Sequence, residues 1–177
     1  KIDWDSKEET PDYASMYLTI EALEDGQIRS NGQAVSFSVN NGEWFNSNNY
    51  VTLAKGDNVR LKSTSFCNQY ASLLITDISL PCNIYGNIMS LGYNDNFQGQ
   101  SQLPDYAYRN LFYRWSGIVS AKNLILPATT LANGCYFGMF NLCTSLTSAP
   151  ALPATTLKEG CYNSMFYNCD ALTEAPA

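Results

Sequence analysis

The chain has 177 residues, a length that allows one mid-sized domain or two small ones. Charged residues make up 15%, the net charge is −6 and no basic run occurs, which argues against binding to nucleic acids or to acidic membrane surfaces. Histidine is absent, which excludes catalysis through histidine and removes the commonest metal ligand.

Residues 1–12 are polar and charged, and this composition predicts a flexible tether. The chain starts at Lys1 instead of Met, so we expect a processed or trimmed chain that follows a lipidated N-terminus. The pairs Asp3/Asp5 and Glu8/Glu9 resemble the paired carboxylates of glycosidases. Such catalysis needs a rigid frame, and we interpret these side chains as solvated.

Residues 13–100 are predicted to form an all-β sandwich of antiparallel sheets. Apolar and polar residues alternate in the segments around Leu18, Phe37 and Leu61, which is typical of half-buried strands. Asp-Gly and Asn-Gly turn signals separate these segments. We expect further strands at 72–76, 78–80 and 87–91.

Three aromatic residues, Trp44, Phe45 and Tyr50, surround a turn rich in Gly and Asn. They suit either stacking on a sugar or anchoring of a peptide, and core packing is the alternative. They are the discrete ligand site that the sequence suggests for this part of the chain.

Two further features have a structural and a functional reading. Cys67 and Cys82 suit either a disulfide, which export would permit, or two free thiols. The run 94–96, with Asp105 nearby, offers oxygen ligands for calcium, but it matches no EF-hand spacing and an Asx-rich turn is favoured.

A tandem repeat occupies the C-terminal part. The segments 126–151 and 152–177 each span 26 residues and match at 17 positions without a gap. A degenerate copy lies upstream, with Tyr108 and Phe112 equivalent to Tyr136 and Phe140, and it holds two extra residues in 122–125. Neither copy can bury its apolar side chains alone, so the copies are expected to stack.

Each copy is predicted to hold a short helix and a short strand. Leu131, Cys135 and Met139 recur at a spacing of four, which indicates an amphipathic helix that Thr129 or Thr130 would cap. Residues 146–149 favour a short strand before Pro150.

Four cysteines occupy equivalent places in the two copies, Cys135 with Cys161 and Cys143 with Cys169. Disulfides between stacked copies or metal binding are alternatives, although the spacing fits no zinc site. All four fall on the apolar stripe, so we favour buried free thiols.

The repeated LPATTL, GCY and MF motifs resemble the BspA-like, or Treponema-type, leucine-rich repeats of bacterial surface proteins. This resemblance covers about residues 103–177. It implies strand–helix repeats that stack into a solenoid, and a function in adhesion to host or matrix proteins. The segments 35–45 and 85–100 resemble an extracellular β-sandwich hairpin and the junction before such repeats in bacterial lipoproteins.

We therefore expect a tether (1–12), a β-sandwich (13–100) and leucine-rich repeats (101–177) in a non-enzymatic surface protein that is extracellular and lipid-anchored. The expected ligand is a host or matrix protein on the strand face of the repeats, and the alternative is a glycan on the β-domain aromatics. We expect no cofactor or metal, and self-association through the uncapped last repeat is a further hypothesis. A hydrolase that uses carboxylates alone has no support in the sequence. The candidate strip on the repeats is Thr147, Ser148, Thr173 and Glu174.

Overall fold

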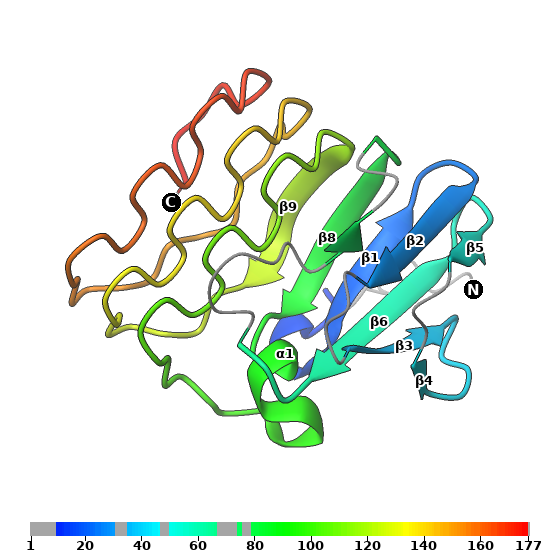
Figure 1. The fold of residues 1–177 in the computed structure, drawn as a ribbon, viewed down its shortest axis with the longest axis horizontal. Coiled ribbons are helices and arrows are strands. Elements are labelled where there is room, and N and C mark those ends of the chain that lie inside the picture. Colours follow the sequence, from blue (N-terminus) through cyan, green and yellow to red (C-terminus); the bar gives the residue numbers. More distant parts are fainter. Residues whose placement is uncertain (1–9, 31–34, 47–49, 67–73, 76–78, 177) are drawn as a thin grey trace, which may run out of the picture.

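The computed structural model of the protein describes residues 10–30, 35–46, 50–66, 74–75 and 79–176. The fold is mainly β, as expected, and the described residues contain one short α-helix (Figure 1). In chain order the elements are η1 (Tyr13–Ser15), β1 (Leu18–Ala22), β2 (Gly26–Ser30), β3 (Val35–Val39), β4 (Phe45–Asn46), β5 (Val51–Leu53), β6 (Asn58–Ser63), β7 (Leu74–Ile75), β8 (Cys82–Asn87), α1 (Ser90–Tyr93), η2 (Asn94–Asn96) and β9 (Ile118–Ile125).

The strands form a six-stranded sheet in the order β4-β3-β6-β1-β8-β9 and a smaller sheet in the order β5-β2-β7. Alternation of burial is confirmed along β6, where Leu61 is buried between two partly exposed neighbours. Leu18 in β1 and Phe37 in β3 are buried as expected, but Thr19 and Ser38 of the same strands are buried as well. The buried face and the smaller sheet, through Ile28 and Leu53, belong to one apolar core.

The expected strand at 87–91 is wrong, because β8 ends at Asn87 and α1 begins at Ser90. The Asn87 side chain accepts a hydrogen bond from the Met89 N–H, a local turn that interrupts the strand. The buried Ser90 hydroxyl then donates to the carbonyl of Leu61 and accepts from the N–H of Leu18, which fixes α1 against the sheet.

The structure describes only part of the two other expected strands. Within 72–76 it contains β7. Of 78–80 it describes residues 79–80, and these are not a strand. Strand β8 was not foreseen at all. It pairs with β1, and the register places Thr19 opposite Tyr85 and Glu21 opposite Asn83.

Strand β9 joins the two expected parts of the chain. It belongs to the degenerate repeat copy, and it pairs in parallel with β8, whereas the other pairs of the six-stranded sheet are antiparallel. The same apolar core extends across residue 100, from Ile84 in β8 to Ile118 in β9 and Phe140 beyond it. The repeats and the N-terminal strands therefore share both a sheet and a core.

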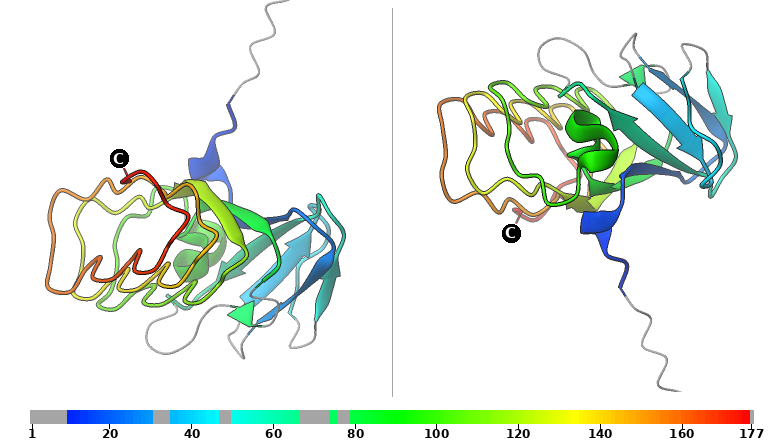
Figure 2. Two further views of the ribbon diagram at one scale, coloured as in Figure 1. Left: turned by 90° about the horizontal axis from the view of Figure 1, so that it is seen from above. Right: turned by 90° about the horizontal axis from the view of Figure 1, so that it is seen from below.

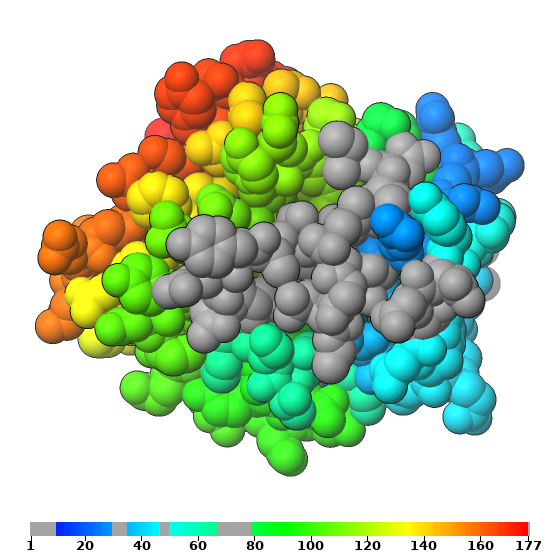
Figure 3. Space-filling model, in the orientation of Figure 1, coloured from blue at the N-terminus to red at the C-terminus, as the bar shows by residue number. Residues whose placement is uncertain are grey.

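The repeat copies form coils that lie side by side at the β9 edge of the sheet (Figures 1 and 2). Equivalent backbone bonds link successive coils. The N–H of Phe112 donates to the carbonyl of Met139 at 2.9 Å, and the N–H of Phe140 donates to that of Met165 at 2.9 Å. The last copy forms one end of the molecule in Figure 3.

The helix expected in each copy is wrong. Alternate N–H groups bond three residues back, as Phe137 does to Gly134, while the intervening groups donate to a neighbouring coil, as Gly138 does to Asn163 of the next coil and Tyr136 to Ala107 of the preceding one. An α-helix would use these groups internally, so bonding between coils replaces it. Thr130 forms a bridge with Thr156 instead of a cap. Residues with positive φ recur in register: Tyr108, Asn110 and Arg114; Tyr136, Gly138 and Leu142; Tyr162, Ser164 and Asn168.

The strand expected at 146–149 is present only as a short bridge. Ser148 forms a parallel bridge with Ser120 of β9, and the Thr147 N–H donates to the carbonyl of Val119 at 2.9 Å. This edge of the second copy thus runs beside β9, although the second and third copies contain no named strand in the described residues.

Aromatic rings stack through the coils in two ladders. Tyr136 lies between Tyr108 and Tyr162 at centroid distances of 6.0 and 5.7 Å, with interplanar angles of 13° and 10°. Phe112, Phe140 and Phe166 form the second ladder. These ladders explain why the same aromatic residues recur in each copy, because each ring packs on its equivalent one coil away.

Candidate functional site

The structure does not bring Trp44, Phe45 and Tyr50 together. Phe45 pairs with Phe37, whose side chain lies in the core, and remains 39% exposed at the edge of the sheet. Tyr50 is 52% exposed and lies beside Arg29 of the smaller sheet, with the guanidinium carbon 5.2 Å from its ring centroid. A shared stacking platform of these residues is therefore absent.

Trp44 is half-buried in a cluster on the outer face of the large sheet. The Lys62 ammonium lies 4.3 Å and the Arg60 guanidinium 5.1 Å from its ring centroid, and Tyr17 contacts it edge-on. Asp95 completes the cluster by accepting hydrogen bonds from Lys62 and Tyr17, each at 2.8 Å. Trp44 thus packs against two cationic side chains.

The hydrogen bond from Lys62, followed by that from Tyr17, lowers the pKa of Asp95. Burial, followed by the contact with Asp95, raises the pKa of Tyr17. Asp95 is the central residue of the run 94–96, which the sequence offered as calcium ligands. Its carboxylate forms a salt bridge with the Lys62 ammonium group. No group of three metal-ligating His, Cys, Asp or Glu side chains occurs in the described part of the chain.

The predicted strip on the repeats is partly assembled. Thr147, Ser148 and Glu174 line one pocket of about 360 Å³, together with Lys122 and Leu172. Its walls come from the degenerate copy and both regular copies, so the stacking of the coils creates it. Thr173 is exposed next to this pocket in sequence but does not line it.

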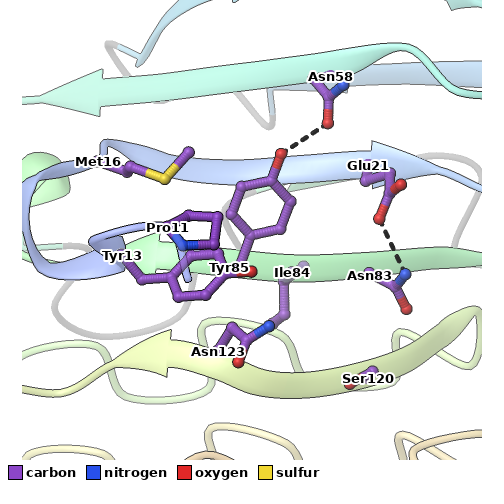
Figure 4. Close-up of a pocket in the computed structure, with 10 residues that line it drawn as sticks. All are labelled: Pro11, Tyr13, Met16, Glu21, Asn58, Asn83, Ile84, Tyr85, Ser120 and Asn123. Carbon is purple, nitrogen blue, oxygen red and sulfur yellow. Dashed lines mark hydrogen bonds between the residues drawn. The ribbon is translucent and has the colours of Figure 1, made fainter. Parts of the chain in front are cut away.

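A second pocket lies on the outer face of the large sheet, where sequence reasoning placed no site (Figure 4). It has a volume of about 330 Å³ and extends across β6, β1, β8 and β9. Its lining residues are polar or aromatic for the most part: Pro11, Tyr13, Met16, Glu21, Asn58, Asn83, Ile84, Tyr85, Ser120 and Asn123.

Two short hydrogen bonds fix the floor of this pocket. The Tyr85 hydroxyl donates to Asn58 Oδ1 at 2.7 Å, and Asn83 Nδ2 donates to Glu21 Oε2 at 2.9 Å (Figure 4). Tyr13 contacts the Tyr85 ring in an edge-on arrangement with centroids 5.6 Å apart. Burial, followed by the nearby Glu21 and Tyr13, raises the pKa of Tyr85, so this phenol stays neutral and keeps its donor hydrogen.

The signal for this pocket in the sequence was weak. Glu21 is an outward position of a correctly predicted strand, but Asn83 and Tyr85 belong to β8, which was not predicted. Ser120 and Asn123 come from the repeats, which were expected to form a separate domain. Only the parallel pairing of β8 with β9 brings these residues together.

The cysteines of the repeats are free thiols, as favoured: Cys135, Cys143 and Cys169 are buried and Cys161 is half-buried. Burial raises the pKa of the Cys135 thiol to about 11, so it behaves as an inert apolar group. Cys82 is also free and buried, and Cys67 lies outside the described residues.

The paired carboxylates of residues 3–9 lie outside the described residues as well. Among the residues that are described, no helix combines the length and the apolar character needed to cross a lipid bilayer.

Comparison with known proteins identifies no relative. No protein-family model matches the chain, and searches of curated proteins and of solved structures also found no match.

Proposed function

We propose that the protein is a non-enzymatic bacterial surface protein of the adhesion type, which binds a host or matrix protein through one face of its repeats. The proposal includes an extracellular location with a lipid anchor. It also treats the N-terminal strands as a β-sandwich and the coils as a short BspA-like stack. The resemblance of the repeated motif supports these points.

The observation that carries the proposal is the pocket between the coils. Thr147 is exposed and Glu174 is exposed, and Lys122 of the neighbouring coil lies in the same depression. The strip therefore offers a hydroxyl, a carboxylate and an ammonium group around apolar carbon from Leu172 and Ala175. Such mixed surfaces suit protein ligands, and stacked copies add contacts that are individually weak.

Surface plasmon resonance tests the proposal with immobilised protein and three purified matrix proteins: fibronectin, laminin and collagen. We expect at least one to bind, and we expect Thr147→Arg and Glu174→Arg each to weaken that binding at least about tenfold, since tenfold is about 1.4 kcal/mol. Matched controls are Thr64→Arg and Glu24→Arg, which make the same changes at exposed residues of the N-terminal part.

Equal loss in the control variants would show that charge, and not the strip, governs the interaction. Absence of binding to all three proteins, with the variants and the parent equally folded by circular dichroism, would count against a matrix ligand.

A second copy of the chain is a further candidate partner, through exposed side chains of the last repeat copy. Leu157 and Tyr167 of this copy are 58% and 61% exposed, and its rings Tyr162 and Phe166 stack on those of the preceding copy. Sedimentation velocity tests this association: Tyr167→Glu should shift any dimer to monomer, whereas Tyr113→Glu, an exposed residue of the first coil, should not.

A further inference from the structure

We propose that the pocket on the outer face of the large sheet binds a neutral saccharide. This site differs in residues and ligand from the strip on the repeats, and it does not depend on the proposed protein ligand.

The lining groups are those that hydroxyl-rich ligands need. Asn83 and Asn123 offer amide groups, Glu21 offers a carboxylate, and Ser120 offers a hydroxyl. The Asn58 amide is engaged within the protein, because it accepts from Tyr85 and donates to the carbonyl of Gly56. Because Glu21 and Asn83 are bonded to each other through one oxygen and one amide nitrogen, the second carboxylate oxygen and the amide oxygen are available as acceptors. A pair of adjacent acceptors on a fixed frame suits neighbouring hydroxyl groups of a sugar ring.

The aromatic wall supplies the apolar surface for such a ligand. Tyr13 and Tyr85 are both half-buried and face each other at the edge of the pocket (Figure 4). The carbon-bound hydrogens on a face of a sugar ring pack favourably on an aromatic ring, and the Tyr85 hydroxyl, which donates to Asn58, can still accept a hydrogen bond. The hydrogen bond of Tyr85 to Asn58 holds that ring in one orientation before any ligand arrives.

The charge of the pocket restricts the ligand class. None of the ten lining residues is Lys or Arg, and one of them, Glu21, is acidic. A phosphate, sulfate or carboxylate group would find no cation in the pocket and would meet the Glu21 carboxylate. Its volume of about 330 Å³ lies at the lower end of the usual range of ligand pockets, about 300–1,000 Å³, and suits a short saccharide.

An irregularity in β9 selects this lining. Asn83 pairs with Ser120, and regular pairing would then place Lys122 opposite Tyr85. The register shifts between Asn83 and Tyr85, so Asn123 takes that place. Lys122 lines the pocket between the coils instead.

The shift falls at the stretch where the degenerate copy has two more residues than the regular copies. Bulges re-aim side chains in this way and are common beside binding sites. The shift between Asn83 and Tyr85 thus places the Asn123 amide, and not the Lys122 ammonium group, opposite Tyr85.

Isothermal titration calorimetry tests the proposal with neutral oligosaccharides of glucose, mannose, xylose and N-acetylglucosamine as separate probes. We expect at least one to bind, Tyr13→Ala to weaken the binding at least tenfold, and Tyr50→Ala, an exposed tyrosine of the smaller sheet, to leave it unchanged. A second variant, Asn123→Arg, places a cation in the pocket. Because Asn123 is exposed, we expect this variant to fold normally and to lose saccharide binding.

Three results would overturn the proposal. One is the absence of heat from every neutral probe with the folded protein. Another is equal loss of binding in Tyr13→Ala and Tyr50→Ala. The third is that the protein binds oligolysine and no saccharide, and that Glu21→Gln removes the oligolysine binding. This result would make the pocket an acidic site for cationic peptides.

Discussion

The tyrosine ladder allows a sharp test of how the coils are stabilised, because the hydroxyl groups of two equivalent tyrosines differ in hydrogen bonding. The Tyr108 hydroxyl donates to the carbonyl of Ile88 at 3.1 Å. The Tyr136 hydroxyl is buried and has no hydrogen-bond partner among the described residues. Both rings are fully buried and stack on each other, so a change to Phe removes only the hydroxyl.

The two substitutions are expected to act in opposite directions. Tyr108→Phe removes a buried hydrogen bond and should lower the free energy of unfolding by about 0.5–1.5 kcal/mol. Tyr136→Phe removes a desolvated hydroxyl that gains nothing in return, and it should raise the free energy of unfolding by about 1 kcal/mol. The variants should therefore differ by about 2 kcal/mol.

Urea denaturation followed by circular dichroism measures this difference, and thermal melting offers an independent reading at about 2–4 °C for each kcal/mol in a chain of this size. Equal destabilisation in both variants would refute the reasoning, since it would mean that the Tyr136 hydroxyl has a partner or that the ladder requires tyrosine for another reason.

Three further predictions concern other parts of the chain. Gly86→Ala should abolish soluble expression, because its Cβ would overlap the carbonyl of Tyr17, whereas Gly56→Ala, with a similar positive φ but open space, should cost only about 1 kcal/mol in urea denaturation; equal effects would contradict this. Because burial raises the pKa of Cys135 from 9.0 to about 11, its contribution to stability is present below about pH 9 and lost as the pH rises toward about 11. Over this pH interval the free energy of unfolding should fall less steeply in Cys135→Ala than in the parent protein. An unchanged slope would show that the Cys135 thiol does not cause the loss of stability. The pKa of Asp95 is lowered from 3.8, so Asp95→Asn should cost at most about 1 kcal/mol at neutral pH, and the cost should vanish as the pH falls below the native pKa; a constant difference at all pH values would argue against the ion pair.

The repeats show where pattern reading succeeds and where it stops. Burial of Cys135, Tyr136, Met139 and Phe140 follows the predicted stripe, yet the backbone consists of turns. A spacing of three and four residues fits one side of a helix, and it also fits consecutive turns whose inward residues recur at the same interval. The two alternatives differ in the acceptor to which each N–H group donates. In the observed turns, many of these acceptors lie in a different copy.

The candidate sites show the same limit. Alternation in β1 correctly separates Leu18 and Ile20 from the outward Glu21, because it depends only on neighbours along the strand. The partners of Glu21 across the sheet depend on strand order, which alternation does not contain. For this reason the sequence suggested Trp44, Phe45 and Tyr50 from their closeness along the chain, and the structure separates them.

By itself, the sequence determined the mainly-β class, the burial of Leu18, Phe37 and Leu61 in three strands, the repeat and its buried residues, since all of these follow from local patterns of apolar side chains. Only the tertiary structure decided that β9 extends the N-terminal sheet and that turns replace the helices. It alone also gathers Tyr13, Glu21, Asn83 and Asn123 around one pocket. The reason is that hydrogen bonds between strands and coils join residues far apart in the chain, and their register follows from the packing of the whole core.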